Sequence, residues 1–396
     1  MRAILLSLLN NEPAYRTQLA KETSLSTTTI TNLIDELMEL GIVVEKGAEE
    51  SEGSRRVGRP RTALYLVHNA RYAVGVHIGV GTYRIAVTNL TAKIQHKRID
   101  PFDLDMHPDE VLKDISANIE KTIVQCGVKR DRIIGVGVGV SGLVDYRSGV
   151  NILAPNLGWR DVCVQKCLTE DLNLPVVVDN NVRAMALGEA IFGIGREVSS
   201  LVFVYGRIGV GAGIVVNGQV FRGSDLGAGE IGHVVVIPEG GESCRCGNRG
   251  CLETLVSEPV LVKKAEQLSR QNRDSVLSNY LRQSNGGKPI EQIFKAAREG
   301  DQLAIDIIEQ SACYLGIALG NLVNVLNPEL ILLGGIFAQG EDLFLPSTKQ
   351  AIENSAFGGL GDLVTVRATG FGRQAAIIGA AGLALTTFFY LHPEEI

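Results

Sequence analysis

The sequence Glu230-Ile231-Gly232-His233, with Cys-Arg-Cys-Gly-Asn-Arg-Gly-Cys-Leu-Glu at residues 244–253, is the most informative part of this chain. It brings together a histidine and three of the seven cysteines. One imidazole and three thiolates form a tetrahedral ligand set that suits Zn²⁺, and a closed four-ligand site leaves no position for a catalytic water. The sequence therefore predicts a structural zinc site, with a reduced and buried group of cysteines as the alternative. The expected ligands are His233, Cys244, Cys246 and Cys251.

Composition indicates a globular chain of more than one domain. Its 396 residues, 45% apolar and 21% charged, are too many for one ordinary core. The net charge of −6 is not typical of a nucleic-acid-binding protein, so any DNA contact requires a local basic patch. The clustered cysteines fit a reducing cytoplasm. The apolar stretch 375–391 falls short of about 20 apolar residues, so we expect a buried helix there and no membrane contact.

Residues 1–70 predict a DNA-binding head. We expect three helices. The first is short and covers residues 4–9, the second begins after an N-cap at Thr17, and the third covers 27–40 after an N-cap at Ser26. Two short helices joined tightly, with small polar residues on the first turn of the second, match the helix-turn-helix pattern. Short side chains that donate and accept hydrogen bonds suit base edges. The expected DNA contacts on this helix are Thr27, Thr28, Thr29, Thr31 and Asn32.

Two strands, at residues 42–45 and 62–67, are expected to flank a flexible tip and form a wing. Arginine suits the negative potential of a narrow A·T minor groove, and the sequence Gly-Arg-Pro-Arg ends this tip. An acidic run at 49–52 indicates that part of the loop is solvated. A protein-interaction module is the alternative interpretation of the head. The expected wing contacts are Arg55, Arg56, Arg59 and Arg61.

The rest of the chain predicts two α/β halves of similar design, 71–195 and 196–396. The first half has expected strands at 73–80, 83–90 and 92–99, a helix at 108–126, a strand at 133–140 and a turn at 141–145. The second begins with a strand at 201–205 and a glycine-rich hairpin at 209–216. Two βββαβ halves that meet at a cleft would place their ligand-binding loops between them.

The His/Cys motif, the turn Asn156-Leu157-Gly158-Trp159 and the helix-turn-helix in front resemble the ROK family of repressors, open reading frames and sugar kinases. The resemblance covers nearly the whole chain and is to the repressor branch, with its xylose, N-acetylglucosamine and glucose-type repressors. It implies an N-terminal winged helix-turn-helix (α+β) followed by an actin-like, RNase H-like ATPase fold in two α/β lobes. The sugar-facing residues that the resemblance implies are Asn156, Asn180, Asn181, Glu230, His233 and Glu253. The alternative is that these polar residues only satisfy loop backbones.

Kinase members of the family provide a test of catalysis. Their base is the Asp of an Asn-Asp pair, where this chain has Asn180-Asn181, and an amide cannot accept a proton at neutral pH. Their first phosphate loop, Asp-x-Gly-Gly-Thr, corresponds to residues 77–81, His-Ile-Gly-Val-Gly. Their second loop, Gly-Thr-Gly, corresponds to residues 207–209, Arg-Ile-Gly. We therefore expect no ATP site and no kinase activity.

These expectations describe a cytoplasmic, zinc-containing transcriptional repressor of sugar-utilisation genes, controlled by a sugar or sugar derivative in the interlobe cleft. A homodimer or a dimer of dimers is expected, because paired heads bind the half-sites of a palindromic operator. Two alternatives remain. One is a repressor controlled by a protein of the sugar-transport system, and the other is a sugar kinase with a fused DNA-binding head.

Overall fold

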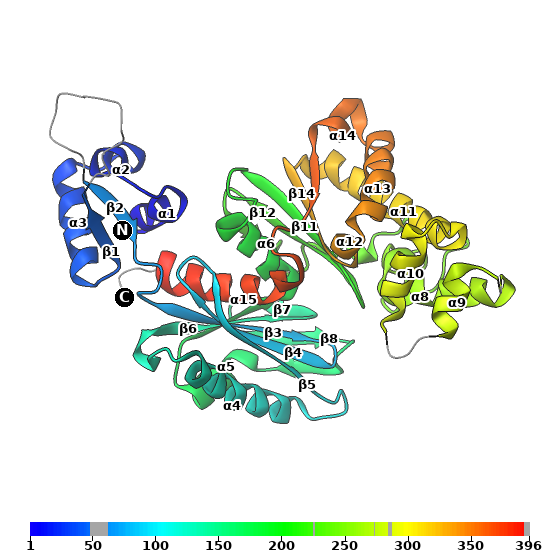
Figure 1. Cartoon of the computed structure of the whole chain (residues 1–396), viewed down its shortest axis with the longest axis horizontal. Helices are drawn as coiled ribbons and strands as arrows, with labels where there is room; N and C mark the ends of the chain where they lie inside the picture. Colours follow the sequence, from blue (N-terminus) through cyan, green and yellow to red (C-terminus); the bar gives the residue numbers. More distant parts are fainter. Residues whose placement is uncertain (48–61, 225, 273, 284–286, 392–396) are drawn as a thin grey trace.

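The computed structural model describes residues 1–47, 62–224, 226–272, 274–283 and 287–391. Figure 1 shows a small N-terminal head beside two larger lobes, with the last long helix, α15, running between the lobes toward the head. Each lobe is built around a five-stranded sheet. A cleft between the lobes is lined by residues of both.

The head contains three helices and a two-stranded sheet: α1 (Arg2–Asn10), α2 (Arg16–Thr23), α3 (Thr27–Glu39), β1 (Val43–Lys46) and β2 (Ala63–Leu66). The strands pair antiparallel. The predicted cap of α3 is confirmed, because Ser26 Oγ accepts a hydrogen bond of 3.1 Å from the Thr29 N–H. The predicted cap at Thr17 is wrong. Helix α2 begins at Arg16, after Tyr15, whose side chain makes no capping bond.

The first lobe has the strand order β10-β6-β3-β4-β5. Strands β6 and β10 run parallel to β3, while β4 and β5 continue the sheet antiparallel. Helices α4 and α5 cover one face and α15 covers the other (Figure 1). The bounds are β3 (Tyr72–Gly79), β4 (Thr82–Asn89), β5 (Ile94–Pro101), α4 (Pro108–Cys126), η1 (Arg130–Arg132), β6 (Ile133–Val140), α5 (Val164–Leu172) and β10 (Val176–Asn180).

The second lobe repeats this connectivity with the order β13-β12-β11-β14-β15. Its first three strands are antiparallel neighbours, and β14 and β15 run parallel to β11. The predicted similarity of the halves is therefore confirmed at the level of the sheets. Helix α6 (Asn181–Phe192) lies within the first half of the sequence but packs against β11 and β12 of the second-lobe sheet. The bounds of the second lobe are β11 (Ser200–Gly206), β12 (Val210–Val216), β13 (Gln219–Phe221), η2 (Ile231–His233), α7 (Glu253–Val256), α8 (Glu258–Gln271), α9 (Val276–Arg282), α10 (Pro289–Arg298), α11 (Gln302–Leu326), β14 (Leu330–Gly335), α12 (Ile336–Gln339), α13 (Glu341–Ser355), η3 (Phe357–Gly359), α14 (Leu360–Leu363), β15 (Thr365–Ala368) and η4 (Gly372–Gln374).

A small sheet beside the first lobe corrects the prediction of a plain turn at residues 141–145. Strands β7 (Leu143–Asp145), β8 (Val150–Ala154) and β9 (Trp159–Val162) form an antiparallel sheet in sequence order. Each of these strands has five residues or fewer, which is too short for a clear alternating pattern. The sheet carries Asn156 in the turn between β8 and β9.

Helix α15 (Ala375–Leu385) is buried along its whole length and ends in one π-helical turn, Thr386–Tyr390. It packs directly on the first-lobe sheet, because a Cβ at Gly137 would lie 2.0 Å from the Ala380 carbonyl oxygen. At its other end the Tyr390 hydroxyl donates a 2.7 Å hydrogen bond to the Leu90 carbonyl. One apolar cluster joins this end of the helix to Leu5 of the head. The helix therefore connects the interlobe region to the head.

One helix among the described residues, α11, has the length and apolar composition to cross a membrane, and 56% of its apolar window is buried inside the fold. Burial of that kind is also found in the core helices of globular proteins.

Candidate functional site

The predicted metal ligands converge on one point. The ligand atoms of His233, Cys244, Cys246 and Cys251 all lie within 4.8 Å of one another. His233 Nδ1 is 3.6 Å from Cys244 Sγ, and Cys246 Sγ is 3.7 Å from Cys251 Sγ. Ligand atoms bound tetrahedrally at about 2.0 to 2.3 Å from Zn²⁺ are separated by about 3.5 to 3.8 Å. The chain therefore provides a donor set that could hold a metal ion such as zinc.

The thiols of this cluster differ in acidity. The backbone N–H of Asn248, followed by the neighbouring thiols, lowers the pKa of Cys246. Burial raises the pKa of Cys251 to about 12. A cysteine binds a metal as the thiolate, so a divalent cation is the group that would favour the charged form of the buried thiol. Because Nδ1 of His233 faces the sulfurs, the rest of its ring is available to the cleft that His233 also lines.

A cavity of about 720 Å³ lies between the lobes. Its walls come from β3, the β6–β7 and β8–β9 turns, the start of α6, β12 and the loop that leads to the metal cluster. A volume of this size is typical of small-molecule sites. The structure brings all six sequence-predicted polar residues to this cavity: Asn156, Asn180, Asn181, Glu230, His233 and Glu253.

Asn180 and Asn181 have different surroundings although they are adjacent. Asn180 caps α6, since its Oδ1 accepts from the N–H groups of Val182 at 2.9 Å and Arg183 at 3.2 Å. Its Nδ2 donates to the Gly142 carbonyl at 2.8 Å. Much of the hydrogen-bonding capacity of Asn180 is thus used on the backbone. For this residue, the contacts agree with the alternative interpretation that the polar residues satisfy loop backbones. Asn181 makes one long contact, 3.4 Å to Ser141 Oγ, and retains more capacity for a ligand.

Asp179 lies just before this pair but does not face the cleft as a base. Its side chain is 1% exposed and pairs with Arg183 Nε at 2.7 Å and with Arg222 Nη2 at 2.8 Å. Arg183 also donates to the Leu226 and Val144 carbonyls at 2.6 and 3.0 Å. This network joins β10 and α6 to the loop after β13. It was not predicted, because it depends on Arg222, which is 43 residues from Asp179 in the sequence.

The two glutamates of the cleft lie near the His/Cys cluster. Glu253 Oε2 accepts a 3.0 Å hydrogen bond from the Val210 N–H. Glu230 opens onto the cleft, yet the surrounding walls desolvate it enough to raise its pKa, with Glu253 adding to the effect and His233 and Arg183 opposing it. A carboxylate accepts hydrogen bonds from hydroxyl groups, so both residues suit a polyhydroxylated ligand.

The segments that correspond to the kinase phosphate loops also line the cleft, through His77, Gly79 and residues 207–209. His77 is buried in β3, and neither ring nitrogen has a hydrogen-bond partner among the described residues. Burial, followed by the charges of Arg84 and Arg207, lowers the pKa of His77 to about 3. The sequence motifs indicate the replaced loops, but the unpaired, buried position of His77 is visible only in the fold.

The predicted DNA-contacting side chains of α3 lie on its outer surface. Thr27, Thr28, Thr29 and Asn32 are exposed, and Thr31 is half-buried with its hydroxyl bonded to the Thr27 carbonyl at 2.9 Å. Arg55, Arg56, Arg59 and Arg61 lie outside the described residues.

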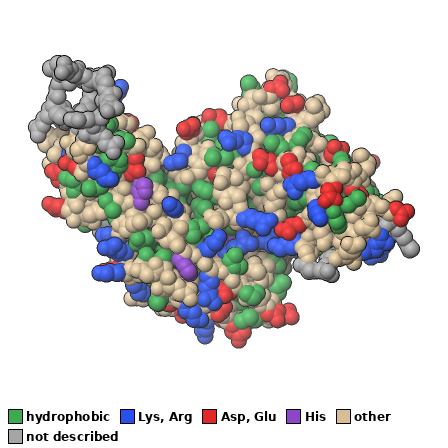
Figure 2. Space-filling model, in the orientation of Figure 1, with side chains coloured by type: hydrophobic (Ala, Val, Ile, Leu, Met, Phe, Trp, Pro, Cys, Tyr) green, Lys and Arg blue, Asp and Glu red, His purple; other side chains and the backbone are tan. Residues whose placement is uncertain are grey.

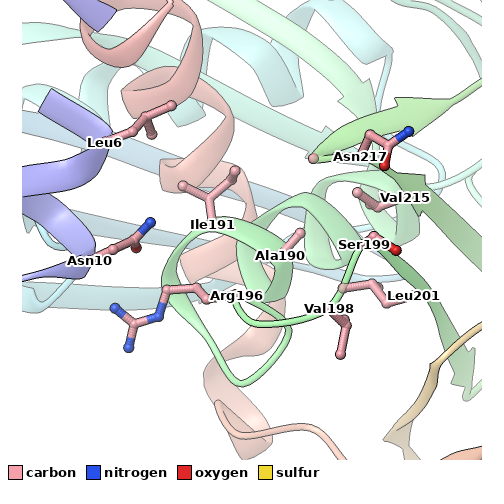
Figure 3. Close-up of a pocket in the computed structure, with 11 residues that line it drawn as sticks. Leu6, Asn10, Ala190, Ile191, Arg196, Val198, Ser199, Leu201, Val215 and Asn217 are labelled. Atoms are coloured by element: carbon pink, nitrogen blue, oxygen red, sulfur yellow. The ribbon is translucent and has the colours of Figure 1, made fainter. Parts of the chain in front are cut away.

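A second cavity, of about 260 Å³, lies between the head and the second lobe. Figure 3 shows Leu6 and Asn10 of α1 facing Ile191 of α6, with Arg196 and Asn217 nearby. Its lining combines six aliphatic side chains with four polar ones, from Asn10, Arg196, Ser199 and Asn217. It marks the contact between the head and the lobes.

Two similar α/β lobes around a cleft are the features of the actin-like two-lobe fold, and the protein belongs to this fold class. Residues 73–387 match the ROK family. The chain belongs to the ROK family, and its relatives place it in the repressor branch.

Both repressors and kinases are among its relatives. The chain is 33% identical over 355 residues to the xylose repressor of Caldicellulosiruptor bescii, covering 89% of this chain and 87% of that one. It is 34% identical over 314 residues to the glucokinase of Halalkalibacterium halodurans, covering 79% and 94%. A crystal structure of a ROK family transcriptional regulator, a homolog of the E. coli MLC protein, superimposes with a TM-score of 0.83 at 28% identity, covering 98% of this chain and 97% of that one.

Proposed function

We propose that this chain is a DNA-binding transcriptional repressor of sugar-utilisation genes, with a sugar or sugar derivative as the effector in the interlobe cleft. The observation that carries the proposal is the convergence of Asn181, Glu230, Glu253 and other polar side chains on a cavity of about 720 Å³ in a chain that also carries the head. Full-length similarity to proteins named as a xylose repressor and a ROK transcriptional regulator supports it. We place the protein in the cytoplasm, where its DNA target is found.

DNA binding is assigned to residues 1–70 as a winged helix-turn-helix, in front of lobes at 71–195 and 196–396. The order of three helices and two antiparallel strands supports this assignment. Exposed threonines and Asn32 on the first turns of α3 are short polar groups that suit base edges. The wing arginines supply cations for phosphates and the minor groove. A dimer, or a dimer of dimers, would present paired heads to a palindromic operator.

The His/Cys cluster is proposed to hold one structural Zn²⁺. The ion would fix the loop that carries Glu230 and Glu253. It would also hold the His233 ring so that its second nitrogen faces a sugar hydroxyl, because a metal-bound histidine commonly forms a hydrogen bond through the ring nitrogen that does not bind the metal. Such a site would couple the shape of the cleft to the folded state of the loop.

We propose that the chain has no kinase activity and no ATP site. Asn181 replaces the expected base, and Asp179 is held by two arginines instead of facing the cleft. The similarity to a glucokinase keeps a kinase with a fused head as the second candidate. A repressor controlled by a sugar-transport protein is the third.

One set of experiments separates the three candidates. The purified, zinc-loaded protein is mixed with its own promoter DNA, and DNA binding is followed by fluorescence anisotropy at several salt concentrations with and without a panel of sugars. We expect specific binding whose affinity changes with one sugar, and a smaller salt slope for Arg59→Ala because one phosphate contact is lost. An unchanged salt slope would exclude Arg59 from the interface.

Calorimetry with the same sugars tests directly whether a small effector binds. Absence of heat with every sugar, together with intact DNA binding, would favour a protein partner over a small effector. ATP-dependent phosphorylation of any sugar above background would favour the kinase.

A further inference from the structure

His77 is an unusual residue for the wall of a sugar-binding cleft. It is 4% exposed, lines the cavity, and leaves both ring nitrogens without a partner in the described part of the chain. A buried polar group without a partner costs free energy unless a ligand or water satisfies it. The ring nitrogens of His77 are therefore free of partners among the described residues and can form hydrogen bonds with a ligand in the cavity.

Arg84 lies beside it. Residues 77 and 84 are direct partners in the antiparallel pair of β3 and β4, so their side chains share one face of the sheet about 5 Å apart. Arg84 is half-buried, its Nε has no hydrogen-bond partner, and no carboxylate among the described residues forms an ion pair with it. Burial lowers the pKa of Arg84, Tyr205 opposes this shift, and the charges of Arg207 and Arg373 add to it.

Arg207 completes this group from the second lobe. It lines the cavity, and its charge acts on both His77 and Arg84. Its ion-pair partner, Glu258, is 3.8 Å away, which is a weak contact. On the face drawn in Figure 2, Lys and Arg side chains gather where the two lobes meet.

The cleft therefore has two electrostatic regions. The charges that act on His77 are both cations, Arg84 and Arg207. Glu230, near the metal cluster, is influenced by His233, Arg183 and Glu253. A neutral sugar would satisfy the carboxylate and amide region but leave the half-buried Arg84 without a counter-charge, which is costly.

We propose that the effector is an anionic sugar derivative, a phosphate ester or a sugar acid, whose anion binds His77 and Arg207 and is attracted by the charge of Arg84 beside His77, while its hydroxyls bind Asn181, Glu230 and Glu253. This inference rests on the proposed function and specifies the chemical class of its ligand. The guanidinium groups match the oxygens of phosphate and carboxylate, and the imidazole donates a further hydrogen bond. His77 and Arg207, which lie in the segments that correspond to the kinase phosphate loops, thus form an anion site for the effector next to Arg84 of β4.

The test is calorimetry on the full-length, zinc-loaded protein with matched ligands: glucose, glucose 6-phosphate and glucuronate, then N-acetylglucosamine and its 6-phosphate, then xylose and xylonate. Inorganic phosphate and a non-hydrolysable ATP analogue are further probes. We expect a charged member of one set to bind at least about tenfold more tightly than its neutral parent, because charge-assisted hydrogen bonds are the strong ones. The preferred anion then distinguishes the phosphate ester from the sugar acid.

Two variants and one control localise the effect. Arg207→Gln and Arg84→Gln should each weaken binding of the anionic sugar about tenfold or more and leave the neutral parent within about twofold. Arg298→Gln, which removes a surface arginine paired with Asp342 at 2.7 Å, should change neither. Arg207 is more exposed than His77, so its variant decides the question if Arg84→Gln does not fold.

The outcomes separate the inference from the function on which it rests. A neutral sugar that binds as tightly as its charged partners and releases DNA would overturn the anion site and leave the repressor intact. Unchanged affinity of the anionic sugar in both arginine variants would also overturn it. Tighter binding of the ATP analogue than of any sugar derivative would overturn it in favour of a nucleotide site. If no sugar of either kind binds, the sugar-controlled repressor and the anion site both fail.

Discussion

At the residue scale, the difference between Asn181 and Asp179 supports the proposal that the position of the kinase base serves for binding in this chain. Asn181 faces the cavity and has hydrogen-bonding groups to spare, while the neighbouring carboxylate at Asp179 is fully engaged by Arg183 and Arg222. An amide binds hydroxyls without accepting their protons. The same backbone frame can therefore hold a sugar and leave it unreacted.

Restoring the carboxylate should not restore catalysis. In Asn181→Asp the base would be present, but the two segments that would hold ATP phosphates keep His77 in place of the family's Asp and Arg207 in place of its first Gly. We expect ATP-dependent sugar phosphorylation to stay at background, measured by a coupled assay across common hexoses. Turnover that rises clearly above the wild-type background in this variant would show that the cleft still binds ATP productively.

Cys246→Ser should remove the metal. Cys246 Sγ is 3.7 Å from Cys251 Sγ within the cluster, and a hydroxyl is a poor substitute for a thiolate toward Zn²⁺. We expect zinc per chain, measured by elemental analysis after dialysis, to fall from about one to a small fraction. Sugar affinity should fall with it, since the loop carries Glu230 and Glu253. The matched control is Cys313→Ser, a free exposed cysteine, and full zinc content in Cys246→Ser would argue against the assignment.

His77 should make stability depend on pH. Its folded pKa of about 3 is below the unfolded value of about 6.5. Its contribution is therefore complete above pH 6.5 and is lost as pH falls toward 3, because only the unfolded chain gains the proton. One such proton corresponds to a slope of at most about 1.4 kcal/mol per pH unit. Urea unfolding from pH 7 to pH 5 should give a smaller slope for His77→Asn than for the wild type, and equal slopes would contradict the assignment.

At the element scale, α15 depends on the absence of side chains beneath it. A Cβ at Gly137 would lie 2.0 Å from the Ala380 carbonyl oxygen, a backbone atom that cannot move alone. Gly137→Ala should therefore displace the helix and cost about 1 to 3 kcal/mol or more of unfolding free energy, measured by urea denaturation. Gly211→Ala, where the nearest atom would be 3.6 Å away, is the control and should cost much less. A small loss at Gly137 would mean that α15 can shift freely.

Local sequence signals predicted the elements well, and long-range contacts explain most of what they missed. The cap at Ser26 and the wing strands were predictable because they depend on neighbouring residues. The similar lobes and the six cleft residues followed from strand patterns and the family motif. The position of α15 was not predictable, because it depends on glycines more than 200 residues earlier in the chain. The pairing of His77 with Arg84 required the strand register.

At the scale of the whole molecule, the two lobes are joined beside the cleft by Asp179, Arg183 and Arg222. Arg222, in the loop after β13, binds a carboxylate at the end of β10 and stacks 4.1 Å from the Tyr146 ring centroid. Arg183 spans from α6 to the Leu226 and Val144 carbonyls. Any change in the angle between the lobes must alter these contacts. The network is therefore placed to transmit ligand binding through α6 to α15 and the head.

Arg222→Gln should weaken this coupling more than it weakens either binding event. The substitution removes one of the two arginines on Asp179 and leaves Arg183, so the fold should persist. Sugar affinity and DNA affinity should each change little when measured alone, whereas the effect of saturating sugar on DNA affinity should shrink by about fivefold or more, within the usual range of coupling energies. Fluorescence anisotropy of operator DNA with and without sugar measures both. Lys263→Gln removes an exposed pair with Glu242 at 3.8 Å and should leave the response unchanged. A full sugar response in Arg222→Gln would mean that lobe movement is communicated to the head by another route.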